Sequence, residues 1–286
     1  MFEILKLMRT KQYVKNLFMF LPLFFSLNLF NFGLFFKTFL GFILFSITAS
    51  SIYILNDIND INEDKNHPDK KERPIASGKI SLSKAKLIMI FLLLVGLTGS
   101  FLLNLNFFFI LIFYFLMNIA YSLKLKHIAI VDIFIIATGF VLRVFAGGVI
   151  GEITCSKWII LMTFLLALFI GLAKRRNDIL LAVKGLTIRK NIDGYNLDFI
   201  NSSIIIMGAI TIVAYIQYTV SKEVINQFGT DYIYLTTFFV LLGFLRYLQI
   251  TLVENNSGSP SELLVKDKFL IFSILGWMLS FLFIVY

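Results

Sequence analysis

Long apolar runs separated by short polar connections dominate the chain. Each run is about 17–22 residues long, enough for a helix to cross a lipid bilayer. Their composition favours helices over the strands of a barrel, which would alternate polar with apolar residues. We therefore expect an all-α integral membrane protein, with residues 1–286 forming a single bundle of about nine transmembrane helices near 17–35, 38–55, 84–103, 106–122, 128–149, 157–173, 203–220, 232–249 and 268–286.

The first of these runs is the least regular. Pro22, Asn28, Asn31 and Gly33 interrupt the segment 17–35. Proline removes a backbone donor, and the polar residues are costly in lipid. A broken or interfacial helix is therefore an alternative to a full span here.

The composition excludes a soluble protein. Hydrophobic residues make up 58% of the chain, charged residues only 15%, and the mean hydropathy is +0.86; soluble domains carry roughly 25% charged residues. Cys155 is the single cysteine, so an internal disulfide or a thiolate metal site is excluded. The apolar run after the N-terminal cations lacks a small-residue cleavage site, so we expect no cleavable signal peptide.

The cations gather in alternate connections. The N-terminus, the 56–83 loop, the 123–127 turn and the 174–202 loop are basic, whereas the other connections hold little beyond Lys37, Lys157 and Lys222. By the positive-inside rule the basic set, with the N-terminus, is cytoplasmic, and an odd number of spans places Tyr286 outside. We expect a multi-pass protein of the cell (inner or plasma) membrane. The net charge of +9 then indicates anionic lipid and phosphorylated substrates rather than nucleic acid.

A polar stretch, 51–79, carries six of the 17 acids. At about 100° per residue, Asn56, Asp57, Asp60 and Asp64 fall on one face of one helix. Three carboxylates and an amide at one spot repel one another unless a cation neutralises them, and oxygen-only ligands favour Mg²⁺, which leaves positions for substrate phosphates. We predict a magnesium site at these four residues, with catalytic roles for Asp57 and Asp60. The alternative is a solvated loop of mixed charge.

Cations at the same predicted membrane face suit phosphate groups. Lys124 closes the fourth span with Tyr121 and Ser122. We predict a catalytic role for it as a phosphate contact, although a lysine there can also be a snorkelling anchor. Arg143 is an intramembrane charge that is either functional or a buried structural ion. The remaining candidates for phosphate binding are Lys15, Asn16, Arg73, Lys174 and Arg175, and the alternative for the last two, within Lys174-Arg-Arg176, is a topological stop.

The motifs together resemble one family. Asn56-Asp-x-x-Asp60-x-x-x-Asp64 within about nine spans is similar to the UbiA-type intramembrane prenyltransferases. A longer series looks like their decaprenyl-phosphate phosphoribosyltransferase branch: Arg9-x-x-Gln-x-x-Lys-Asn16, His67-Pro-x-Lys-x-x-Arg-Pro-Ile-Ala-Ser-Gly78, Tyr121-Ser-x-x-Leu125, Gly139-Phe-x-Leu-Arg143, Lys174-Arg-Arg176, Arg246-Tyr247 and Ser259-Pro-Ser-Glu-Leu-Leu264 ahead of Asp267.

The resemblance implies an activity. A member of this branch moves 5-phosphoribose from phosphoribosyl pyrophosphate to a polyprenyl phosphate, with Mg²⁺ and release of pyrophosphate. Lys124 and Arg73 would then bind pyrophosphate. Lys15, Arg143, Lys174 and Arg175 would bind the 5-phosphate and the lipid phosphate.

Two other functions stay open. An aromatic prenyltransferase of the same family carries a second motif, Asp-x-x-x-Asp, after the sixth span, where this chain has Lys174-Arg-Arg176. A non-catalytic carrier or flippase of lipid phosphates is the other. Glycines in the spans permit a homo-oligomer without requiring one.

Overall fold

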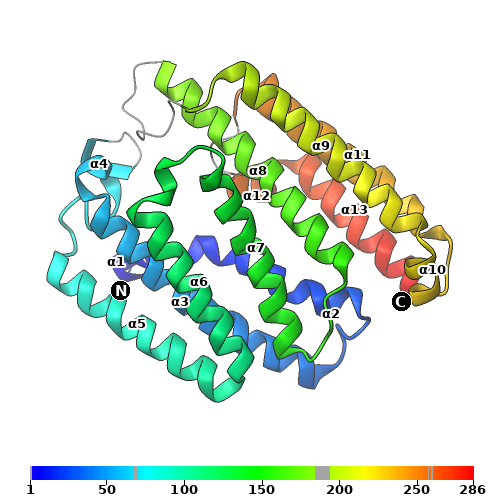
Figure 1. The fold of residues 1–286 in the computed structure, drawn as a ribbon, viewed down its shortest axis with the longest axis horizontal. Coiled ribbons are helices and arrows are strands. Elements are labelled where there is room, and N and C mark those ends of the chain that lie inside the picture. The colour runs from blue at the N-terminus through cyan, green and yellow to red at the C-terminus, as the bar shows by residue number, and fades with distance from the viewer. Residues whose placement is uncertain (1, 67–69, 184–193, 257, 259) are drawn as a thin grey trace. The chain divides into compact units, whose positions relative to one another are not determined.

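The computed structural model describes residues 2–66, 70–183, 194–256, 258 and 260–286, and all its regular elements are helices (Figure 1). The N-terminal elements are α1 (Phe2–Leu7), the 3₁₀ helix η1 (Thr10–Phe20), α2 (Leu21–Phe25), α3 (Phe32–Asn59), α4 (Ile61–Asn66) and η2 (Lys70–Glu72). They are followed by α5 (Leu82–Leu103), α6 (Leu105–Leu123), η3 (Leu125–His127), α7 (Val131–Ile150) and α8 (Lys157–Val183). The C-terminal elements are α9 (Leu197–Val220), α10 (Lys222–Phe228), η5 (Tyr232–Thr236), α11 (Thr237–Leu252), α12 (Pro260–Lys266) and α13 (Lys268–Val285).

Within the described residues, eight helical segments are long and apolar enough to cross a membrane: α3, α5, α6, α7, α8, α9, η5 with α11, and α13. The predicted all-helical membrane class is therefore confirmed. The segment 17–35 is broken, as the alternative anticipated, into the end of η1, the short α2 and the start of α3. Pro22 lies in the first turn of α2, where a missing backbone donor costs nothing.

Polar residues mark where several helices begin. The side chain of Asn31 accepts the backbone N–H of Leu34 at 3.2 Å at the start of α3. Asn104 does the same for Phe107 at 3.0 Å, and it alone separates α5 from α6. These caps satisfy helix-end donors that lipid cannot satisfy.

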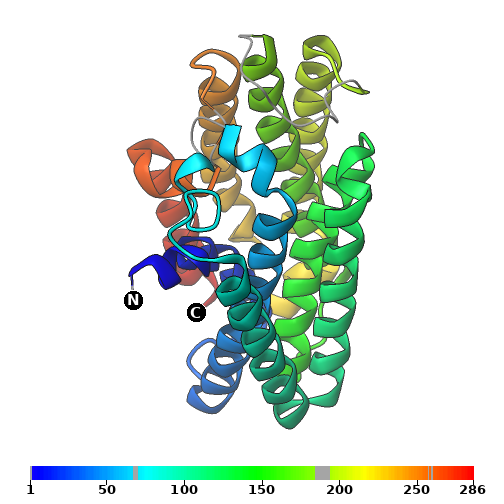
Figure 2. The same ribbon diagram turned by 90° about the vertical axis from the view of Figure 1, so that its left-hand side faces the viewer.

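The chain forms two compact units. The first comprises residues 1–160 and 184–194, and its described part places α3 against α5, α6, α7 and η1 (Figures 1 and 2). Its core includes Phe45, Phe107 and Leu111, all fully buried. Figure 2 shows α4 continuing beyond the end of α3, so the polar stretch extends from a helix that this core holds.

The second unit comprises residues 161–183 and 195–286. In it α11 packs against α9 and α13. Phe169 of α8 lies with its ring centroid 4.9 Å from Phe244 and 5.4 Å from Tyr247, both on α11. Aromatic packing therefore joins this part of α8 to α11.

Gly147 lets η1 approach α7 closely. A Cβ atom on Gly147 would lie 1.8 Å from the backbone oxygen of Met19. Only a residue without a side chain fits there, and this contact holds the N-terminal segment on α7.

We predict that Gly147→Ala destabilises the protein by about 2–3 kcal/mol, because the added methyl group must push η1 away. Thermal unfolding of the purified protein in detergent measures the change. Gly33→Ala is the matched control, since the nearest atom that the new Cβ would meet, Asn31 Oδ1, is 3.5 Å away. Equal melting temperatures for the two variants would contradict the close contact.

Candidate functional site

The predicted carboxylates lie where α3 ends. Asn56 and Asp57 are in its last turn, Asp60 caps it, and Asp64 lies on α4. The backbone N–H of Asp60 donates to Asn56 at 2.9 Å and that of Asp64 donates to Asp60 at 2.8 Å. The helical spacing therefore persists across the junction at Asp60. Asp57 and Asp64 are both buried at 2% exposure. The alternative of a solvated loop of mixed charge therefore does not describe these two residues.

One guanidinium bridges the two buried carboxylates. Nη1 of Arg73 lies 3.1 Å from Asp57 Oδ1 and 2.6 Å from Asp64 Oδ2. Arg9 also pairs with Asp57 Oδ1. Burial and the like charge of Arg9 lower the pKa of Arg73 from its ordinary value, whereas the two carboxylates favour its charged form.

Asp60 and Asn56 have partners at the end of α6 and in the turn that follows it. Lys126 Nζ pairs with Asp60 Oδ1, and Ser122 Oγ donates to Asn56 Oδ1. Ser122 is therefore at the predicted site. Lys124, the lysine that the sequence favoured, is exposed at the C-cap of α6, whereas Lys126 is buried in the following 3₁₀ turn. Tyr121 is half-buried on the last turn of α6.

Sequence reasoning missed Arg9 and Lys126 as partners of the carboxylates. Lys126 lies beyond the helical phase of α6, because the chain turns at Lys124 before η3 begins. Arg9 adopts a left-handed backbone conformation, with φ 52° and ψ 47°, that joins α1 to η1. Arg9 begins the motif Arg9–Asn16, and Lys126 follows the motif Tyr121–Leu125. These positions were the signal from which both cations could have been predicted.

The donor set suits a hard divalent cation. Asp57, Asp60, Asp64 and Asn56 offer only oxygen ligands. In the part of the chain that the structure describes, no three acidic, histidine or cysteine side chains are gathered closely enough to hold a metal ion as they stand. Arg73 nevertheless shows that one positive charge fits between Asp57 and Asp64. The residues present therefore fit Mg²⁺ once their cationic partners are exchanged.

Arg143 and Asn16 form a buried network on α7 and η1. Arg143 donates to Asn16 Oδ1 at 2.8 Å, to the Gly139 carbonyl at 2.6 Å and to the Tyr114 hydroxyl at 2.8 Å. Its guanidinium also lies 5.1 Å from the centroid of the Phe45 ring. These contacts match the structural alternative for Arg143, and its binding role stays a prediction.

Lys15 lies beside this network. Burial, with the nearby positive charges of Arg143 and Arg9, lowers the pKa of Lys15 to about 8. A phosphate group next to Lys15 would favour the charged form of this amine, because an opposite charge nearby raises its pKa.

The basic run of α8 belongs to the second unit, so its position opposite the carboxylates stays a prediction. Arg176 donates to Asn201 at 2.7 Å, to the Thr251 carbonyl at 2.6 Å and to Asn255 at 2.8 Å, which ties α8 to α9 and α11. Arg175 pairs with Asp178 at 2.6 Å, and Lys174 is exposed. Arg176 therefore has a structural role. The run of three cations in the sequence did not distinguish it from Lys174 and Arg175.

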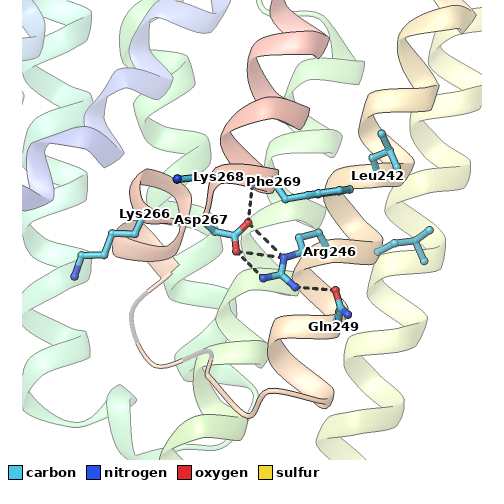
Figure 3. A pocket seen from close by; sticks show the side chains of 8 residues that line it. Leu242, Arg246, Gln249, Lys266, Asp267, Lys268 and Phe269 are labelled. Atoms are coloured by element: carbon cyan, nitrogen blue, oxygen red, sulfur yellow. Dashed lines mark hydrogen bonds and ion pairs between the residues drawn. The ribbon is translucent and has the colours of Figure 1, made fainter.

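The second unit also contains a pocket of about 690 Å³ between α11 and the start of α13 (Figure 3). Arg246 lies in it and pairs at 2.7 Å with both Asp267 and Glu254. Hydrogen bonds from Arg246 hold the pKa of Asp267 below its ordinary value. Asp267 also caps α13, so two of the recognised motif residues join α11 to α13 rather than presenting a free cation.

The fold and the site define a multi-pass helical membrane protein with carboxylates and cations clustered at the end of one span. The chain belongs to the UbiA prenyltransferase family, which it matches over residues 17–272. The predicted family is thereby confirmed.

Several relatives have a named activity. Decaprenyl-phosphate phosphoribosyltransferase of Mycolicibacterium smegmatis is 30% identical over 85% of this chain and 78% of its own length. The enzyme of that name from Corynebacterium glutamicum is 29% identical over 99% of this chain and 86% of its own. Digeranylgeranylglyceryl phosphate synthase of Sulfurisphaera tokodaii is 30% identical over 74% of this chain and 76% of its own.

Solved structures share the fold. A UbiA homologue from Archaeoglobus fulgidus bound to GPP and Mg²⁺ superimposes with a TM-score of 0.71 at 20% identity, covering 99% of both chains. At this identity the likeness shows the architecture alone.

We predict that affinity for a phosphorylated donor falls roughly tenfold between pH 7 and pH 9, because the Lys15 ammonium, with a pKa of about 8, is lost over this range. Isothermal titration of the purified protein measures it, and Lys15→Arg should make the affinity independent of pH there. Because the pKa of Lys15 is lower in the folded protein, its protonated form lowers the free energy of unfolding. This loss of stability disappears as the pH rises from about 8 towards 10. A pH profile that Lys15→Arg leaves unchanged would contradict a phosphate contact.

Proposed function

We propose that this protein transfers 5-phosphoribose from phosphoribosyl pyrophosphate to a polyprenyl phosphate in a magnesium-dependent reaction that releases pyrophosphate. The relatives of that activity cover 85–99% of the chain, which supports the assignment. In the structure, the proposal rests on the cluster of carboxylates at the end of α3 and on α4. Arg9, Arg73 and Lys126 form ion pairs with these carboxylates. A site of this kind suits a substrate with several phosphates better than one with a single charge.

The reaction would be a displacement at the anomeric carbon. An oxygen of the lipid phosphate, already an anion at neutral pH, attacks that carbon from the face opposite pyrophosphate. A new carbon–oxygen bond forms as the bond to pyrophosphate breaks, and pyrophosphate leaves with the electron pair. The acceptor therefore needs no strong general base.

The leaving group is where this chain's residues act. Asn56, Asp57, Asp60 and Asp64 would hold Mg²⁺, whose chemistry is to neutralise the charge that develops on pyrophosphate. Arg73 and Lys126 are close enough to the carboxylates to bind pyrophosphate oxygens, and Lys126 replaces Lys124 as our candidate because of its contact with Asp60.

The other phosphates require further cations. We assign the 5-phosphate and the lipid phosphate to Lys15, Arg143, Lys174 and Arg175, and Asn16 would hold the Arg143 guanidinium by its hydrogen bond. We place the N-terminus and the acidic stretch in the cytoplasm, where a water-soluble donor is available. The isoprenoid tail would lie along the apolar helices within the bilayer.

A second candidate is transfer of a polyprenyl group from its diphosphate to another acceptor. It is favoured by the relatives named digeranylgeranylglyceryl phosphate synthase. A comparison of donors separates the two functions. The purified protein is given either labelled phosphoribosyl pyrophosphate or a labelled prenyl diphosphate. The proposal requires saturable binding of the first and transfer of its label to polyprenyl phosphate.

We predict that Asp60→Asn lowers the formation of lipid-linked phosphoribose at least a hundredfold in membranes, because loss of one metal-binding carboxylate weakens stabilisation of the leaving group. Glu63→Gln is the matched control, since Glu63 is an exposed acid on α4. Activity of Asp60→Asn within a few-fold of the unchanged protein would remove the carboxylates from the mechanism.

We predict that replacing Lys174 and Arg175 together by Gln weakens donor binding at least tenfold, by removing two charges that we assign to the donor phosphate. Arg176 is kept because its three hydrogen bonds join α8 to α9 and α11. Equilibrium dialysis with labelled donor measures the loss, and thermal unfolding verifies the fold. Unchanged donor affinity in the folded double variant would show that the 5-phosphate binds elsewhere.

A further inference from the structure

Each predicted metal ligand already has a protein partner. Asp57 contacts Arg9 and Arg73, Asp64 contacts Arg73, and Asp60 contacts Lys126. Ser122 donates to the amide oxygen of Asn56. We call Arg9, Arg73 and Lys126 the counter-cations of the site.

The counter-cations come from outside the helix that carries the acids. Arg9 is at the corner between α1 and η1, Arg73 follows η2, and Lys126 is in η3. Arg9 keeps a left-handed backbone, which is unfavourable for a residue with a side chain, and its guanidinium lies 5.3 Å from the centroid of the Tyr53 ring. Three separate short segments therefore converge on α3 and α4 through charge.

A divalent ion and the counter-cations compete for the same oxygens. Mg²⁺ binds carboxylate oxygens at about 2.0–2.1 Å, and Arg73 already lies 2.6 Å from Asp64 and 3.1 Å from Asp57. A guanidinium and a divalent ion placed this close repel each other strongly in a partly buried site. If the metal enters, Arg73 must leave, and a partly buried guanidinium without an anion is costly.

Phosphates would remove that cost. A donor that carries a pyrophosphate offers new anionic partners to each displaced cation while its oxygens complete the metal's coordination. Carboxylates and phosphates would then exchange partners: the acids release the counter-cations and take the metal, and the phosphates take the counter-cations.

We infer that the counter-cations make binding of the divalent ion depend on the donor. The ion alone competes poorly with three tethered cations, whereas the ion and donor together bind cooperatively. This inference rests on the proposed function, because it takes the carboxylates as the metal ligands and a diphosphate-bearing molecule as the donor.

The test is a titration of the full-length purified protein with Mn²⁺, in which electron paramagnetic resonance reports the free ion. Phosphoribosyl pyrophosphate is present or absent, and the lipid acceptor is omitted, so no turnover occurs. The Mn²⁺ that the donor itself chelates is measured in a titration without protein and subtracted. We expect the donor to tighten Mn²⁺ binding at least tenfold, which corresponds to about 1.4 kcal/mol of coupling.

The variant Arg73→Gln tests whether Arg73 competes with the divalent ion or only stabilises the fold. Without the bridging guanidinium, Mn²⁺ alone should bind at least tenfold more tightly than it binds the unchanged protein, and the effect of the donor should shrink. Arg73→Lys, which keeps the charge, should retain most of the coupling. Lys84→Gln is the control, since Lys84 is exposed at the start of α5, and it should behave like the unchanged protein.

Arg9→Gln serves the same purpose if Arg73→Gln fails to fold, because Arg9 contacts Asp57 alone among the acids in the described residues. Equal Mn²⁺ affinity with and without a donor that binds would overturn this inference and leave phosphoribosyl transfer standing. Weaker Mn²⁺ binding in Arg73→Gln would also overturn it. Absence of any binding of labelled donor would instead overturn the proposed function, and this inference with it.

Discussion

The site depends on the attraction between buried carboxylates and positive charge. Asp57 lies in the last turn of the largely apolar helix α3 and Asp64 lies on α4 just beyond it, and both are 2% exposed. Ionised carboxylates in such a place must be paired, because the cost of desolvating an isolated charge is far larger than one hydrogen bond recovers. Arg9, Arg73 and Lys126 provide this charge in the structure, and they determine how the N-terminal corner, the polar loop and the turn after α6 meet α3.

This requirement links the fold to the chemistry. Close contact between η1 and α7 at Gly147 holds the segment that carries Lys15 and Asn16. Asn16 in turn joins Ser46 of α3 to Arg143 of α7, with hydrogen bonds of 2.8 Å on each side. The packing of the first unit therefore keeps these polar side chains in fixed positions between η1, α3 and α7.

The hydropathy pattern was sufficient for the long helices, because the spanning length and the apolar composition leave little choice of structure in lipid. The acidic residues were equally readable, since their spacing follows the helical period. The partners of the acids were not. Lys126 depends on a 3₁₀ turn that ends the phase of α6, and Arg9 depends on one residue in a left-handed conformation. Arg176 looked like its neighbours in the sequence, and only its contacts with α9 and α11 distinguish it.

Anomalous diffraction from crystals of the protein with Mn²⁺ and phosphoribosyl pyrophosphate would test the carboxylate site most directly. The predicted result is a manganese peak bound by Asp57, Asp60 and Asp64, with the Arg73 guanidinium turned from these acids to a donor phosphate. A bound donor with manganese elsewhere, and with Arg73 still bridging Asp57 and Asp64, would contradict it.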